Sequence, residues 1–180
     1  MKTKLIRNLT ALVAIAFLSS SCIQVDNVEN AWKDSKADAA LLGIWEDNDG
    51  NQCAFVKTEK GYHVTTGPNG LEGACKSFDA GGSTYIIVAD LAPALLGFDK
   101  QKPDNKGGTL LRYEVKGGKL IMYSLDGEIV KKAIEAKEVA GTVEDDSASI
   151  SEIDKATIAW FGKIAKKNDG WKSTTYNKVR

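Results

Sequence analysis

The segment TLLRYEVKGGKLIMYSL, residues 109–125, decides the fold that we predict for this chain. Apolar and charged residues alternate before its Gly-Gly pair, and a second apolar run follows. This pattern is typical of a β-hairpin with a tight turn. A two-residue turn pairs Val115 with Leu120 and Tyr113 with Met122, which places all four side chains on one face. The segment therefore predicts two antiparallel strands that share an apolar face.

Short strand-like runs separated by turn residues precede this hairpin. We expect strands at residues 52–57, 61–66, 71–78 and 83–90. The last of these contains Tyr85-Ile86-Ile87-Val88, which is apolar on both alternating faces. Such a strand is expected where a barrel interior lies on one side and a covering helix on the other. Pro93 and Pro103 prevent regular ladder pairing, so residues 91–105 are predicted to form a long loop.

The chain after the hairpin mixes helices with short strands. Asp126 is a candidate N-cap for a short helix to about residue 136. Ser149-x-x-Glu152 resembles a capping box, and it predicts a C-terminal helix near residues 150–167. Further strands are expected at residues 139–143, at 148–150 and, as an edge strand, at 171–180. The whole pattern predicts a mainly β fold with some α: a small antiparallel β-barrel or strongly curved sheet.

The first 22 residues carry an export signal. Basic residues come first, residues 9–18 form an apolar run, and three serines precede Cys22. The run is too short for a permanent membrane span, which needs roughly 20 residues. Small residues followed by a cysteine resemble the lipobox of bacterial lipoproteins, which implies removal of residues 1–21 and lipidation of Cys22. Ordinary cleavage, leaving a soluble secreted protein, is the alternative.

Removal of residues 1–21 leaves 159 of the 180 residues, enough for one domain with a core. We expect a tether at residues 22–40 and a single domain at 41–180.

The mature chain has 21 basic and 24 acidic side chains, a balance without a general nucleic-acid footprint. Basic residues are in excess over 151–180. We interpret this excess as a solvated helix face, with contact to anionic lipid headgroups as the alternative.

Lipidation of Cys22 leaves Cys53 and Cys75 as an even pair in an exported chain, which favours a disulfide. Two buried free thiols or a metal site are the alternatives. With His63, the two cysteines show none of the short paired spacings of zinc sites, so we expect no metal.

Catalytic patterns are not recognisable in the sequence. His63 is the single histidine, and no phosphate loop, zinc motif or nucleophile elbow accompanies it. A lone histidine on a strand is more often structural than catalytic. We therefore expect a protein that is not an enzyme and needs no cofactor.

The meander of short strands, the Gly43-x-Trp45 opening and the late helix resemble the lipocalins and other calycins. In that family the tryptophan plugs the closed end of a barrel. The chain is also similar to uncharacterised lipocalin-like bacterial lipoproteins, through residues 41–45, 81–90, 117–126 and 149–161. The resemblance implies a lipid-anchored domain of the outer membrane, on its periplasmic face or at the cell surface, because Ile23 replaces the aspartate of inner-membrane retention.

The predicted function is the binding of a small apolar ligand inside the barrel. The residues that we expect to line the site are Trp45, Tyr85, Ile87, Tyr113, Val115 and Met122. The alternatives are a protein-interaction module, similar to the small β-barrel periplasmic lysozyme inhibitors, and a purely structural envelope protein. An apolar cavity favours ligand binding, whereas a solid core with a protruding ordered loop favours a protein partner.

Overall fold

The computed structural model describes residues 23–28, 31, 38–58, 61–66, 71–93, 107–144, 147–167 and 170–179. The predicted signal segment and Cys22 lie outside these ranges, as does most of the predicted loop at 91–105. Within them, the chain forms a mainly β structure with two α-helices.

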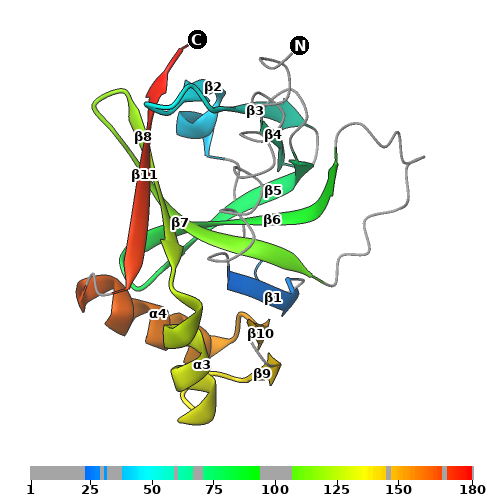
Figure 1. Cartoon of the computed structure of the whole chain (residues 1–180), viewed down its shortest axis with the longest axis vertical. Helices are drawn as coiled ribbons and strands as arrows, with labels where there is room; N and C mark the ends of the chain where they lie inside the picture. Colours follow the sequence, from blue (N-terminus) through cyan, green and yellow to red (C-terminus); the bar gives the residue numbers. More distant parts are fainter. Residues whose placement is uncertain are drawn as a thin grey trace, which may run out of the picture.

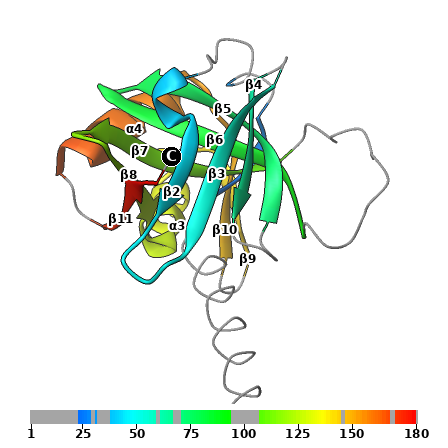
Figure 2. The ribbon, with the colours of Figure 1, turned by 90° about the horizontal axis from the view of Figure 1, so that it is seen from above.

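Eight antiparallel strands close into a barrel (Figures 1 and 2). Around the ring they are β6 (Ser83–Pro93), β5 (Leu71–Ala80), β4 (Gly61–Thr66), β3 (Gln52–Thr58), β2 (Gly43–Glu46), β11 (Trp171–Lys178), β8 (Lys119–Leu125) and β7 (Gly108–Lys116). The pairing of β6 with β7 completes the ring. The predicted antiparallel barrel is therefore confirmed.

Three further strands extend the wall beyond β7. They are β1 (Ile23–Asn27), β10 (Ser147–Glu152) and β9 (Gly141–Glu144). The first half of β7 pairs with β1 and its second half pairs with β8, so β1 continues the position of β8 along the wall. Residues 23–27, which we expected to belong to a tether, are thus an internal strand of the sheet.

The hairpin between β7 and β8 has the predicted register. Val115 lies opposite Leu120 and Tyr113 lies opposite Met122. Gly117 and Gly118 have φ angles of 59° and 74°, the left-handed conformation that this tight turn requires. Since all four paired side chains belong to the same core cluster, the predicted shared face is confirmed.

Two α-helices lie outside the barrel, α3 (Gly127–Glu135) and α4 (Lys155–Lys167) (Figure 1). Asp126 caps α3, and its carboxylate accepts a hydrogen bond from the backbone N–H of Glu128. The start of α4 differs from the expectation. The predicted capping box lies within β10, and Asp154 caps the helix by accepting a 2.8 Å hydrogen bond from the N–H of Thr157.

The final strand also differs from the prediction. The sequence suggested an edge strand, but β11 pairs with β8 along its length and with β2 near its end. The pairing with β2 joins Asn177 to Glu46 and Lys178 to Trp45. These few residues close the ring between its first and last strands.

Candidate functional site

The inner wall of the barrel is a separate apolar cluster. It comprises the buried Leu41, Trp45, Cys53, Phe55, Tyr62, Val64, Cys75, Ile86, Val88, Tyr113 and Leu120, with the partly buried Leu42, Leu111, Val115, Met122 and Tyr176. Four of the six residues predicted to line a ligand site lie here: Trp45, Tyr113, Val115 and Met122.

Tyr85 and Ile87 lie in the other cluster, outside the barrel. Their neighbour Ile86 faces inward and pairs with Leu111, so alternation turns Tyr85 and Ile87 toward the helices. Tyr85 packs there against Phe161 on α4, with ring centroids 4.9 Å apart. The face assigned to this strand was therefore wrong. Both faces are apolar, so the pattern carries no signal for which one points inward.

One end of the barrel is covered by the 3-10 helix η1 (Ala39–Leu41). The carbonyl of Leu41 accepts a 2.7 Å hydrogen bond from the indole N–H of Trp45, and both side chains are buried. The ammonium group of Lys178 lies 5.2 Å from the centroid of the Trp45 ring, within cation–π range. These contacts hold the Trp45 ring within the inner wall next to η1.

A polar group lies among the inward-facing apolar side chains. The Tyr113 hydroxyl donates a 2.8 Å hydrogen bond to the Asp38 carboxylate. The Ser77 hydroxyl lies 3.0 Å from the Tyr113 hydroxyl oxygen. Burial raises the pKa of Tyr113 well above its ordinary value; Ser77 lowers it, whereas Asp38 raises it further. Tyr113 therefore stays protonated and acts as a neutral donor that links η1 to the barrel wall.

Some inward-facing side chains on β7, β8 and β11 are less well covered than those on β3. Phe55 on β3 is buried, whereas Leu111 on β7 and Met122 on β8 are only partly buried. Thr174 lies opposite Met122, so it shares the inward face, and it is exposed. Within the described residues, β2 pairs with β11 at two positions near the end of β11. An apolar part of the barrel interior is therefore accessible to solvent.

Cys53 and Cys75 also face inward, as free buried thiols. Cys53 lies opposite Thr66 on β4, and Cys75 lies opposite Tyr62 on the same strand. An intervening strand and this offset separate the cysteines by roughly 16 Å, whereas a disulfide requires Cα atoms within about 7 Å. The predicted disulfide is therefore wrong. Burial raises the pKa of each thiol to about 12, with Asp47 adding to the rise at Cys53.

A buried arginine on the outer side of the barrel, Arg112, was not predicted from the sequence. The guanidinium carbon of Arg112 lies 3.9 Å from the Tyr123 ring centroid and 4.7 Å from that of Trp171. Burial raises the pKa of Tyr85 to about 12, while Arg112 and the Ser83 hydroxyl counteract the rise. The available sequence signal is the single arginine within the otherwise apolar outer face of residues 108–112.

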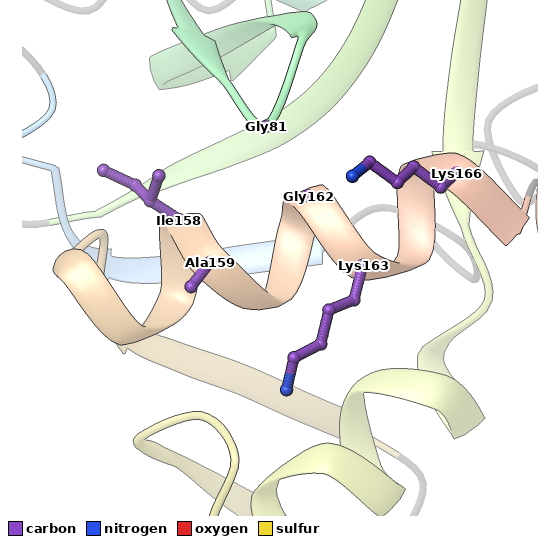
Figure 3. Close-up of a pocket in the computed structure, with 6 residues that line it drawn as sticks. All are labelled: Gly81, Ile158, Ala159, Gly162, Lys163 and Lys166. Atoms are coloured by element: carbon purple, nitrogen blue, oxygen red, sulfur yellow. The ribbon is translucent and has the colours of Figure 1, made fainter.

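A surface hollow of about 380 Å³ lies along α4 (Figure 3). It is lined by Gly81, Ile158, Ala159, Gly162, Lys163 and Lys166. Lys163 and Lys166 point in different directions, and Lys163 pairs with Glu138 at 3.7 Å. The hollow is thus a shallow, mostly apolar surface without a convergent set of polar groups, unlike a typical ligand site.

Metal ligands and membrane-spanning helices would both bear on function. The described residues contain no group of three or more His, Cys, Asp or Glu residues placed to hold a metal ion. None of the helices in the same ranges is long and apolar enough to cross a membrane. Cys22 lies outside the described residues, so its predicted lipidation stays a prediction.

Comparison of the chain with protein-family models, with curated proteins and with solved structures finds no match.

Proposed function

We propose that this chain is an exported, lipid-anchored envelope protein whose lipocalin-like barrel binds a small apolar molecule. The observation that carries the proposal is the exposed part of the inner wall. Met122, beside the exposed Thr174, and Leu111 face the interior but are only partly buried. A barrel filled by its own side chains covers such residues, whereas an eight-stranded barrel can hold one small ligand.

The geometry suggests how a ligand is held. An apolar molecule that enters beside β11 contacts Met122 on β8 and Leu111 on β7, and it approaches the buried side chains of β3 across the barrel. The hydroxyls of Tyr113 and Ser77 add a polar group to the same interior. A mainly apolar lining with few polar groups is typical of sites for small molecules.

A pair of adjacent substitutions tests this site. Thr174→Trp places a large side chain on the inward face, whereas Ser173→Trp places the same group on the outward face of β11, and both positions are exposed. We expect Thr174→Trp to weaken binding of the apolar probe N-phenylnaphthylamine about tenfold and Ser173→Trp to leave it unchanged. Equal affinities, or an unmodified protein that does not bind the probe, would contradict the proposal.

Native mass spectrometry of the protein purified from its own cells identifies the occupant. We expect a small apolar molecule to accompany the wild-type chain and to be lost from Thr174→Trp.

The surface hollow on α4, with Ile158 36% exposed, favours a second function in which the chain binds a partner protein. A co-purifying protein without any small molecule would support that second function.

A further inference from the structure

The polar group inside the barrel, formed by Ser77, Tyr113 and Asp38, has a single hydrogen-bond direction. The Tyr113 hydroxyl donates its one proton to the Asp38 carboxylate at 2.8 Å. The Ser77 hydroxyl must therefore be the donor across its 3.0 Å contact with the Tyr113 oxygen. The backbone N–H of Ala40 donates to the other Asp38 oxygen at 2.9 Å. These hydrogen bonds are all directed toward Asp38, so the group ends in an acceptor.

Asp38 retains acceptor capacity. A carboxylate offers about four acceptor sites, and Tyr113 and Ala40 each occupy one of them. Tyr113 and Ser77 are 2% and 4% exposed, whereas Asp38 is only partly buried. The accessible member of the group is therefore the one that carries a negative charge and still accepts hydrogen bonds. The chemical group that fits it best is a positively charged donor.

A second carboxylate belongs to the same part of the wall. Asp79 on β5 pairs with Thr84 on β6, and Thr84 pairs with Tyr113 on β7. Directly paired residues share a face of the sheet, so Asp79 belongs to the inward-facing row that contains Tyr113, and it is exposed. Burial is the main cause of the raised pKa of Tyr113, and the two charges that add to the rise are Asp38 and Asp79. Negative charges therefore act on this part of the interior.

Two lysines also occupy inward positions. Lys178 pairs with Trp45, and Lys57 pairs with Tyr62. Both lysines are exposed, and the ammonium group of Lys178 lies 5.2 Å from the centroid of the Trp45 ring. Neither is among the charges that shift the pKa of Tyr113. Of these inward residues, the carboxylates thus determine the sign of the charge beside Tyr113.

The polar group lies next to the accessible apolar surface. Met122 lies opposite Tyr113, and Thr174 lies opposite Met122 on the next strand. Neighbouring strands are about 4.8 Å apart. A molecule whose apolar part covers Met122 therefore brings its end group to Tyr113 and Asp38.

We propose that the ligand of the barrel is an amphiphile with an apolar chain and a protonated amine head group, and that Asp38 pairs with this head group. The inference rests on the proposed function, in which the barrel binds an apolar molecule, and it adds the class of that molecule. The ammonium group donates the hydrogen bonds that Asp38 can still accept. The chain lies on Met122 and Leu111. A fatty acid brings a further negative charge to the two carboxylates and is disfavoured.

Displacement of N-phenylnaphthylamine from the purified protein tests the inference. Decylamine, decanol and decanoate share one chain length, and at pH 7 their head groups are positive, neutral and negative. We expect decylamine to bind about tenfold more tightly than decanoate, with decanol between them. This ranking on the wild-type chain needs no variant. Equal binding of all three molecules, or tighter binding of decanoate, would overturn the inference and leave the barrel site in place.

Asp38→Asn removes the charge and keeps the hydrogen bonds, because asparagine also caps helices and its amide both donates and accepts. We expect this variant to bind decylamine about tenfold more weakly and decanol as before. Glu114→Gln is the matched control, since Glu114 follows Tyr113 on β7, faces outward and is exposed. It should leave both affinities unchanged.

The variants give two further outcomes. A preference for decylamine that survives in Asp38→Asn, or that falls equally in Glu114→Gln, would show that Asp38 does not pair with the head group. A wild-type chain that does not bind the probe at all would overturn the proposed function, and this inference with it.

Discussion

Gly81 and Gly162 meet where the turn between β5 and β6 touches α4. A Cβ atom on Gly81 would lie 2.1 Å from the Cα atom of Gly162, a distance that real Cβ atoms do not adopt. Gly81 also has a φ angle of 58°. Two glycines thus allow helix and turn to approach backbone to backbone, and α4 brings Trp160 and Phe161 into the outer core.

This contact predicts a difference between two neighbouring glycines. Gly82 has a φ angle of 82° but open space where a Cβ atom would lie, so Gly82→Ala adds backbone strain alone. We expect it to lower the free energy of unfolding by about 1 kcal/mol. Gly81→Ala adds a backbone clash and should lower it by about 3 kcal/mol. Urea denaturation measures both, and equal losses would contradict the close contact.

Single residues also show how much of the candidate site the sequence could predict. Tyr113, Val115 and Met122 lie in the barrel interior as predicted, because a tight turn fixes the register of the hairpin, whereas the interior position of Trp45 was expected from the resemblance alone. Tyr85 was placed on the wrong face, since nothing local distinguishes two apolar faces of one strand. Solvent access to the interior depends on the pairing of β2 with β11, and no local sequence pattern predicts that pairing.

At the level of elements, the N-cap of α4 makes a pH-dependent contribution to the free energy of unfolding. The N–H of Thr157 donates to the Asp154 carboxylate and lowers its pKa, as do further hydrogen bonds at the start of the helix. The pKa of Asp154 is therefore lower in the folded state than in the unfolded state, where it is near 4. The charged cap stabilises the folded state above that pH, and this stabilisation is lost as the pH falls through the pKa of the folded state.

Substitution of this cap tests the assignment. At pH 7 we expect Asp154→Ala to lower the free energy of unfolding by about 1 kcal/mol. The difference from wild type should begin to shrink as the pH falls below about 4 and should shrink further as the pH passes through the lower pKa of the folded state, where the carboxylate takes up its proton. Asp154→Asn is the matched control, because asparagine also caps helices and has no charge to lose. Urea denaturation at pH 7 and pH 3 gives both comparisons, and a loss for Asp154→Ala that does not change with pH would contradict the charged cap.

The elements that the sequence missed are those defined by distant partners. Ser149 and Glu152 fit a helix cap locally, yet Ser149 pairs with Thr142 on β9 and with Gln24 on β1. Residues 23–27 carry apolar side chains at alternate positions, but too few to mark a strand in a polar segment. In both cases pairing across the sheet outweighs the local preference.

For the whole molecule, the proposed anchor makes a direct prediction. Cys22→Ser should move the protein from the membrane fraction to the soluble fraction, because acyl chains contribute about 0.8 kcal/mol per buried CH₂ group. Cys53→Ser is the matched control, since that thiol is buried inside the barrel and should not affect localisation. Fractionation followed by immunoblotting measures both. A Cys22→Ser variant that stays with the membrane would contradict the anchor.

The seam between β2 and β11 has a consequence for how the molecule folds. Asn177 and Glu46 lie 131 positions apart in the chain, and the N–H of Val179 donates to the carbonyl of Ile44 beside them. The ring cannot close until residues 177 and 178 have been synthesised, and contacts of such long range form slowly. A premature stop codon before residue 177 would leave two unpaired strand edges, which are templates for aggregation. The form of this chain that protein quality control binds most often should therefore be one in which the ring has not yet closed.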